Sequence, residues 1–219
     1  MSFSVLIRYF LFLLYAWFGW LMLQIMLQYF PWNSDAAFLG IKQDALKRPW
    51  YEPIFVVHVF SSILLLPLGF FQFSSEIRKR FPGFHRRAGR MYVLVTLIFV
   101  APSGFFMGLV ANGGWTAQLA FCLLAIFWFW TTWNGWLAAR RKQWMTHRNW
   151  MIRSYALMLS AITLRAWKVI LVFLFHPHPM DVYRMVAWLG WVLNWIVAEC
   201  ILLQLARSDK KKSGHSKLL

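Results

Sequence analysis

Six long apolar runs dominate this 219-residue sequence and restrict the folds open to it. A helix needs about 20 mostly apolar residues to cross a hydrocarbon core roughly 30 Å thick. Runs of that kind cover Val5–Phe30, Pro53–Phe73, Met91–Val110, Trp115–Ala139, Trp150–Phe175 and Val182–Ala206. Backbone groups in lipid must be paired inside helices or a closed barrel. Stretches such as Ile63–Leu66 lack the period-two alternation of barrel strands. The sequence therefore predicts an all-α, polytopic membrane bundle of about six transmembrane helices.

The composition agrees with a membrane fold. Hydrophobic residues make up 60% and charged residues 14% of the chain, whereas soluble domains contain roughly 45–50% and about 25%. The first run is too long for a signal-peptide core, and no small-residue cleavage site follows it, so we expect a retained helix. The connections are short. We therefore expect a single bundle over residues 1–206 and a disordered basic tail over residues 207–219.

The net charge of +16 lies in clusters between the apolar runs. This distribution argues against nucleic acid as a partner and favours the bilayer. If the N-terminus, the Arg78–Arg90 loop, the Arg140–Arg153 loop and the tail share one side, that side carries +15 and the other side zero. The positive-inside rule then places both termini in the cytoplasm and anionic lipid at that face.

Ionisable groups at membrane depth are candidate functional groups. His58 shares a helix face with Ser62 and Gln72, and it lies at a level similar to Arg165 and Lys168 if both helices cross the membrane. Each residue also has a structural interpretation. His58 can bond to a neighbouring hydroxyl or carbonyl, and Lys168 can extend to the interface. Arg165 needs an anion, for which the candidates are Glu52, Asp181 or a bound anionic ligand.

Two basic blocks open predicted helices on the cytoplasmic side, and each contains a histidine, His85 or His147. Topology explains their arginines but not the histidines. Glu199 is the one acid inside the apolar runs, and we predict that it pairs with an inner arginine such as Arg153. The two cysteines, Cys122 and Cys200, fall at different depths and predict neither a disulfide nor a metal pair.

The segments His85-Arg-Arg-Ala-Gly-Arg-Met-Tyr92 and His147-Arg-Asn-Trp-Met-Ile-Arg-Ser154, followed by Thr163-Leu-Arg165, resemble a bacterial family of small predicted membrane proteins. It is the domain of unknown function numbered 2306. The likeness covers roughly residues 51–168, including His58, and leaves the first and last apolar runs outside. The resemblance implies a multi-pass protein of the bacterial cytoplasmic (inner) membrane, and it implies no particular activity.

Three functions remain open, and the first is a redox-linked protein that binds haem or a quinone. Haem, as haem b, needs axial histidines, an apolar slot and cations for its propionates. Against haem, single helices lack repeated histidine pairs, and no Cys-x-x-Cys-His motif occurs. The candidate cofactor-binding residues are His58, His85, His147, Arg165, Lys168 and Arg153, and no metal site is predicted.

The second function is a transporter for a small anion or a lipid head group, which would use Arg165. The third is a non-catalytic assembly or scaffold subunit, either in a homo-oligomer or in a membrane complex. Hydrolase chemistry is not indicated, because Gly-x-Ser-x-Gly and His-Glu-x-x-His motifs do not occur.

Overall fold

The computed structural model describes residues 3–215, and its secondary structure there is helical. Five helices are long and apolar enough to cross a membrane: Val5–Leu27, Tyr51–Gln72, Pro82–Leu109, Trp115–Arg140 and Pro179–Asp209. A bent pair, Trp144–Met158 and Ser160–Phe175, provides a sixth candidate span. The predicted all-α, polytopic membrane architecture with about six spans is confirmed. The cytoplasmic placement of both termini stays a prediction.

Contacts divide the chain into two compact units, Met1–Val95 and Thr96–Leu219. The expectation of a single bundle over residues 1–206 stays a prediction, and each unit is described by itself. The first unit contains α1 (Phe3–Leu27), the short helices η1 (Ala37–Ile41) and α2 (Gln43–Leu46), α3 (Tyr51–Gln72), α4 (Ser75–Arg80) and α5 (Pro82–Leu94).

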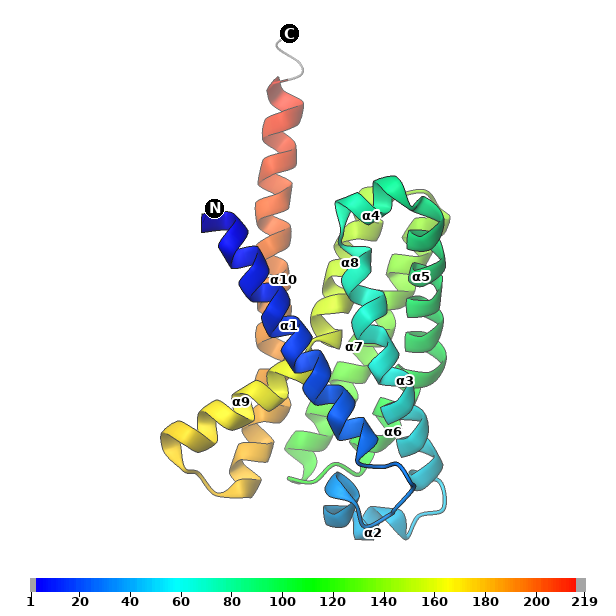
Figure 1. The fold of residues 1–219 in the computed structure, drawn as a ribbon, viewed down its shortest axis with the longest axis vertical. Coiled ribbons are helices and arrows are strands. Elements are labelled where there is room, and N and C mark those ends of the chain that lie inside the picture. The colour runs from blue at the N-terminus through cyan, green and yellow to red at the C-terminus, as the bar shows by residue number, and fades with distance from the viewer. Residues whose placement is uncertain (1–2, 216–219) are drawn as a thin grey trace. The chain divides into compact units, whose positions relative to one another are not determined.

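In the first unit, α3 and α5 pack against each other and α4 joins their ends (Figure 1). Helix α1 contacts α3 through Tyr15, whose hydroxyl donates to the Leu66 carbonyl at 2.6 Å. The ring of Tyr15 also stacks on Phe70, with 4.9 Å between ring centroids. The hydroxyl of this half-buried tyrosine is thus satisfied by a backbone carbonyl of the neighbouring helix, as lipid requires.

The connection between α1 and α3 folds into a compact aromatic cap. Phe55 of α3 contacts Tyr29 edge-on at 5.1 Å and stacks with Phe38 at 6.3 Å. Lys42 is buried in this cap with 3% of its surface exposed, and its ammonium lies 5.6 Å from the centre of the Phe38 ring. Burial lowers the pKa of Lys42 to about 8, because desolvation disfavours the charged form.

The second unit continues the Pro82–Leu109 span through a π-helical segment, Val95–Val100, into α6 (Ala101–Leu109). Pro102 near the start of α6 explains the change of helix type. Its ring lacks an N–H and clashes with the carbonyl four residues earlier, so the preceding turn widens. The unit then contains α7 (Trp115–Arg140), α8 (Trp144–Met158), α9 (Ser160–Phe175) and α10 (Pro179–His215).

Small residues allow the helices of the second unit to pack closely. Ala117 and Ala120 of α7 form a fully buried cluster with Ala187 of α10. Gly108 brings α6 against α7, since a Cβ atom there would lie 3.1 Å from the Cys122 sulfur. This contact agrees with the small-residue packing typical of membrane helices.

The predicted spanning segment Trp150–Phe175 is divided into two helices, α8 and α9. It begins earlier, at Trp144, and bends by 42° between α8 and α9 (Figure 1). A bend interrupts the regular hydrogen bonds, and the freed carbonyls need new partners in lipid. Asn194 of α10 provides one, because its amide nitrogen donates to the Ala156 carbonyl at 3.0 Å and to the Thr163 hydroxyl at 3.0 Å.

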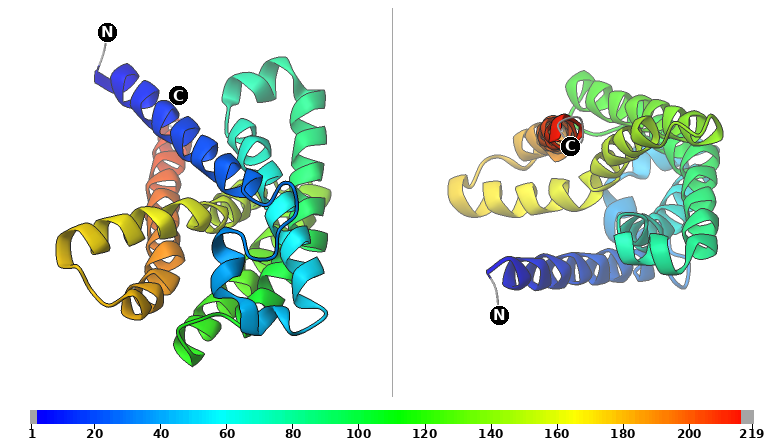
Figure 2. Two further views of the ribbon diagram at one scale, coloured as in Figure 1. Left: turned by 60° about the horizontal axis from the view of Figure 1, so that its bottom comes forward. Right: turned by 90° about the horizontal axis from the view of Figure 1, so that it is seen from above.

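Helix α9 runs toward a short connection that leads into α10 (Figure 2, left). The Thr163 hydroxyl donates to the Gly190 carbonyl at 2.6 Å and so ties the two helices together. Gly190 makes this approach feasible, since a Cβ atom there would lie 2.9 Å from Leu164 Cβ. Helix α10 continues to His215, beyond the end expected at Ala206, and the tail residues 216–219 lie outside the described part.

We predict that wild type gains stability relative to Lys42→Met as the pH rises from about 8 to 10.5. The folded-state pKa of about 8 lies below the ordinary value of 10.5. Between these pH values the unfolded chain binds more protons, so this lysine makes stability rise with pH. Below about pH 8 Lys42 is charged in the folded protein, so the full free-energy cost of burying that charge is present. Thermal unfolding in detergent from pH 7 to 10.5 measures this difference.

Lys47→Met is the matched control, because Lys47 is exposed and pairs with Asp44 at 2.7 Å. The stability of wild type relative to Lys42→Met should rise with pH, while its stability relative to Lys47→Met should show no such trend. A difference between wild type and Lys42→Met that stays constant across the range contradicts the burial cost assigned to Lys42.

Candidate functional site

The six residues singled out in the sequence fall in both units. His58 and His85 lie on α3 and α5 of the first unit. The second unit holds the other four: His147 and Arg153 on α8, and Arg165 and Lys168 on α9.

His58 is half-buried on α3, next to two serines whose hydroxyls bond within their own helix. Ser61 donates to the Val57 carbonyl, and Ser62 donates to the Val59 carbonyl at 3.1 Å. Gln72 follows His58 after about four turns, or roughly 21 Å along the axis. The predicted polar face therefore extends along α3 instead of gathering at one point.

Gln72 links α3 to the start of α5. In the amide orientation that satisfies its neighbours, its nitrogen donates to His85 Nδ1 and to the His85 carbonyl, each at 3.2 Å. Its oxygen accepts from the Gly89 N–H at 3.2 Å. His85 thus has a structural role in the turn between two spanning helices. The basic segment that contains His85 did not reveal this role in the sequence.

His147 has one ring nitrogen fixed by the backbone of a neighbouring helix. Its Nδ1 lies 2.8 Å from the carbonyl oxygen of Gly135 on α7. A carbonyl only accepts hydrogen bonds, so Nδ1 carries the proton and Nε2 of the neutral ring keeps its lone pair. The side chain is half-buried, and in the described part of the chain Nε2 makes no hydrogen bond.

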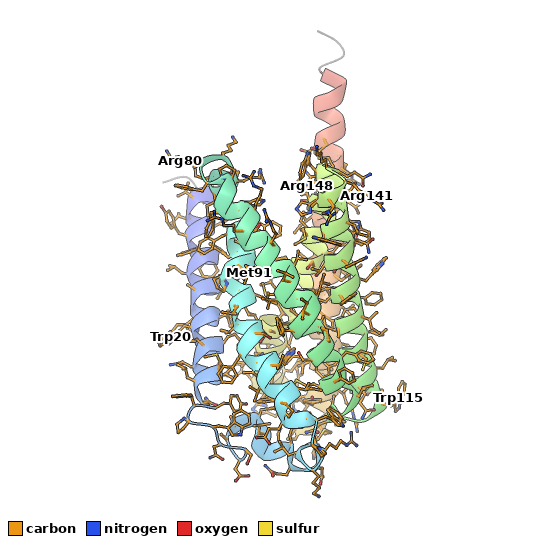
Figure 3. All side chains as sticks on the ribbon, turned by 90° about the vertical axis from the view of Figure 1, so that its right-hand side faces the viewer. Trp20, Arg80, Met91, Trp115, Arg141 and Arg148 are labelled. Atoms are coloured by element: carbon orange, nitrogen blue, oxygen red, sulfur yellow. The ribbon has the colours of Figure 1, made fainter. Side chains whose placement is uncertain are left out.

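His147, Met151 and Ser154 share the face of α8 that packs on α7. Gly135 lies close to α8 at this crossing, since a Cβ atom there would lie 2.7 Å from the Met151 sulfur. Further along, the buried Ser154 hydroxyl lies 2.7 Å from that of Thr132. These contacts hold the imidazole in one orientation. Figure 3 shows the α7–α8 hairpin, with Trp115 at one end and the basic residues Arg141 and Arg148 at the other.

Arg153 and Glu199 form an ion pair between α8 and α10, as predicted from the sequence. Their two hydrogen bonds, Nε to Oε1 and Nη2 to Oε2, are 2.6 and 2.8 Å long. The guanidinium also lies 4.9 Å from the ring centre of Trp150. A bidentate pair of this kind is among the strongest polar contacts in proteins. It neutralises both charges inside the spanning segments.

Arg165 and Lys168 follow the bend in α9. Arg165 is half-buried and donates from Nη1 to the Ala161 carbonyl at 2.6 Å, while Lys168 is exposed. Asp181, expected as a partner for these cations, pairs instead with Arg184 at 3.2 Å. His147 precedes Arg165 by about five helical turns, roughly 27 Å along the chain. The second unit therefore does not gather its four candidate residues into one cluster.

Two polar contacts of the second unit were missed in the sequence. One joins Thr132 to Ser154, and the other centres on Asn194. A usable signal did exist for Asn194. It shares the spacing of Ala187, Trp191 and Ala198, which form the buried face of α10. A polar side chain on such a face needs a partner in a neighbouring helix.

The sequence model of a family described as predicted membrane protein (DUF2306) matches residues 55–202. The chain belongs to this family, whose function is unknown. The match extends past residue 168 and includes most of the last spanning helix, which the resemblance had left outside. No curated protein matches, and no solved structure matches.

We predict that breaking the Arg153–Glu199 pair on one side destabilises the protein by about 2–4 kcal/mol. Removing one partner leaves the other charge at membrane depth without compensation. Arg153→Met and Glu199→Gln should each lower the midpoint of thermal unfolding in detergent or lipid nanodiscs.

The double variant Arg153→Met/Glu199→Gln should lose less stability than the sum of the two single losses, with a coupling energy above about 1 kcal/mol. Additive losses would contradict the pairing. Lys47→Met, which breaks an exposed pair with Asp44, serves as the control, and its effect should stay below about 1 kcal/mol.

Proposed function

We propose that this membrane protein has a redox-linked function and binds the head group of a quinone at His147. The observation that carries the proposal is the hydrogen bond from His147 Nδ1 to the Gly135 carbonyl. It fixes Nδ1 as the donor and leaves Nε2 without a hydrogen bond to a described residue. A quinol hydroxyl can donate to this nitrogen, and a protonated imidazole can donate to a quinone carbonyl.

The surroundings of His147 suit a flat apolar ring. Trp144 and Trp150 lie one helical turn before and after it, and residues at this spacing are neighbours on a helix surface. Trp150 contacts Trp130 of α7 edge-on at 5.0 Å. Aromatic side chains bind planar rings by stacked or edge-to-face contacts. Lipid-soluble quinones would reach this position from within the bilayer.

Haem is the alternative ligand for Nε2 of His147. An axial histidine typically has Nδ1 bonded to a carbonyl and Nε2 facing the metal, so His147 alone would fit one side of a haem. His176 and His178 lie at the far end of the bent α8–α9 span. They cannot complete a bis-histidine site with His147 inside the second unit. This arrangement favours a quinone over haem b.

The charge distribution supports an orientation in which the His147 end of α8 faces the cytoplasm. Arg140, Arg141 and Lys142 directly precede α8, and positive residues are retained on the cytoplasmic side. We place the protein in the cytoplasmic membrane with both termini inside, following the same rule.

Purified protein titrated with a short-chain ubiquinone tests the proposal through quenching of tryptophan fluorescence. We predict saturable binding, and His147→Gln should weaken it at least about tenfold, since glutamine lacks the aromatic acceptor nitrogen. His178→Gln is the control and should bind like the wild type. Its side chain is exposed in the connection between α9 and α10.

An absorption spectrum of the same sample separates the two cofactors. A Soret band that is present in wild type and absent from His147→Gln would identify haem, and not a quinone, as the ligand of His147. Equal quinone binding by His147→Gln and wild type would contradict the site. Binding of neither molecule would favour a scaffold role in a homo-oligomer or a membrane complex.

A second candidate function, transport of a small anion or a lipid head group, rests on the bend between α8 and α9. Interrupted helices mark substrate sites in several transporter folds. Helix α9 begins at Ser160 without a side-chain cap from Leu159, and Arg165 lies in its second turn. This candidate predicts that an anionic substrate protects the protein against thermal unfolding. Arg165→Gln should abolish that protection and Lys168→Gln should retain it.

A screen of small anions by thermal unfolding decides this alternative. Protection that survives in Arg165→Gln, or that is lost equally in Lys168→Gln, would argue against an anion site at the bend.

A further inference from the structure

The turn between α3 and α5 has features that the proposed function does not explain. It covers residues 73–90, named here the basic elbow, and includes the short helix α4. The elbow joins the ends of two spanning helices, Tyr51–Gln72 and Pro82–Leu109, so connectivity places it at a membrane surface. Arg80 marks it at the end of the α3–α5 pair in Figure 3.

The elbow has a defined shape. The Ser74 hydroxyl caps α4 by accepting from the Ile77 N–H at 3.2 Å. Gln72 bridges to His85 and Gly89 at the start of α5. The side chains on this turn are therefore presented from a fixed backbone, which lowers the entropic cost of binding a ligand.

Most of the positive charges of the elbow are not paired with an acidic residue of the described chain. Glu76 pairs with Arg80 at 3.0 Å. The other basic side chains of the elbow are exposed, and none forms an ion pair or a side-chain hydrogen bond with any described residue: Arg78, Lys79, Arg86, Arg87 and Arg90. Five like charges within 13 residues repel one another, so an external anion stabilises them.

Some cations at other polar ends are paired within the chain. Arg148 contacts Asp209 at 3.0 Å, and Arg184 contacts Asp181 at 3.2 Å. Arg140, Arg141 and Lys142 before α8 are exposed and form no ion pair with a described residue, but the elbow carries the larger surplus, five such cations against three. It needs a partner from outside the chain that carries several negative charges or is present at high density.

Exposed aromatic rings identify the kind of anion. Phe73, Phe81 and Phe84 expose 43%, 62% and 49% of their surfaces beside the free cations. Water disfavours this much apolar surface, and a soluble anion such as phosphate would not cover it. At the boundary between head groups and acyl chains, apolar rings insert and cations meet lipid phosphates.

We propose that the basic elbow binds the phosphate head groups of anionic phospholipids, with Phe81 and Phe84 inserted among the acyl chains. Arg78, Lys79, Arg86 and Arg87 provide the phosphate contacts. The site anchors the α3–α5 pair to a lipid surface, and it is independent of quinone binding at His147.

Full-length protein in neutral detergent tests this site by thermal unfolding during addition of dioleoylphosphatidylglycerol or dioleoylphosphatidylcholine. Wild type should reach half-maximal stabilisation at a concentration of the anionic lipid at least about tenfold lower than of the zwitterionic lipid. The preference should shrink as sodium chloride is raised, because salt screens exposed charges.

The variant Arg78→Gln/Lys79→Gln/Arg86→Gln/Arg87→Gln should lose this preference. A matched control removes the same charge elsewhere: Arg140→Gln/Arg141→Gln/Lys142→Gln/Arg207→Gln should keep at least half of it. Equal losses in the two variants, or equal action of both lipids on wild type, would overturn the proposal. If the fourfold variant does not fold, Arg86→Gln/Arg87→Gln replaces it, with a partial loss expected.

The variant Phe81→Ser/Phe84→Ser distinguishes binding of a lipid from binding of a soluble anion. It should weaken the effect of phosphatidylglycerol severalfold while leaving the small effect of inorganic phosphate unchanged. If inorganic phosphate at matched ionic strength stabilises wild type as strongly as the anionic lipid does, the elbow is a site for free anions and the lipid assignment is wrong.

Discussion

The hydrocarbon core offers no hydrogen-bonding partner, and this constraint explains the internal contacts of both units. Tyr15 reaches a carbonyl of α3, and Asn194 takes up a carbonyl freed by the bend between α8 and α9. Arg153 and Glu199 neutralise each other across α8 and α10. These polar side chains thus join neighbouring helices to one another.

The features that depend on composition and length could be predicted from the sequence. Apolar runs predicted the spanning helices, and the single acid inside them predicted the Arg153–Glu199 pair. The bend at Leu159 could not be predicted in this way, because the run through it is apolar without a proline or glycine to mark a break. The side chain that bonds to the break, Asn194, is remote in sequence and reaches it only in the folded chain.

The residue types of the candidate site could be predicted from the sequence, but the roles of the individual residues could not. His85 and His147 occur in similar basic blocks, yet they differ in the fold. His85 is engaged by Gln72 within the turn that supports the basic elbow, whereas His147 is oriented by Gly135 with Nε2 left open. Family membership does not separate these roles, because the family has no known function. The distinction comes from the hydrogen bonds of each ring.

The tautomer of His147 tests quinone binding at this residue most directly. Nitrogen-15 NMR of histidine-labelled protein, assigned with His147→Gln, reports which ring nitrogen carries the proton. We predict a proton on Nδ1, a lone pair on Nε2, and a change at Nε2 when ubiquinone is added. A neutral ring with its proton on Nε2, or a His147 signal unaffected by saturating quinone, would contradict it.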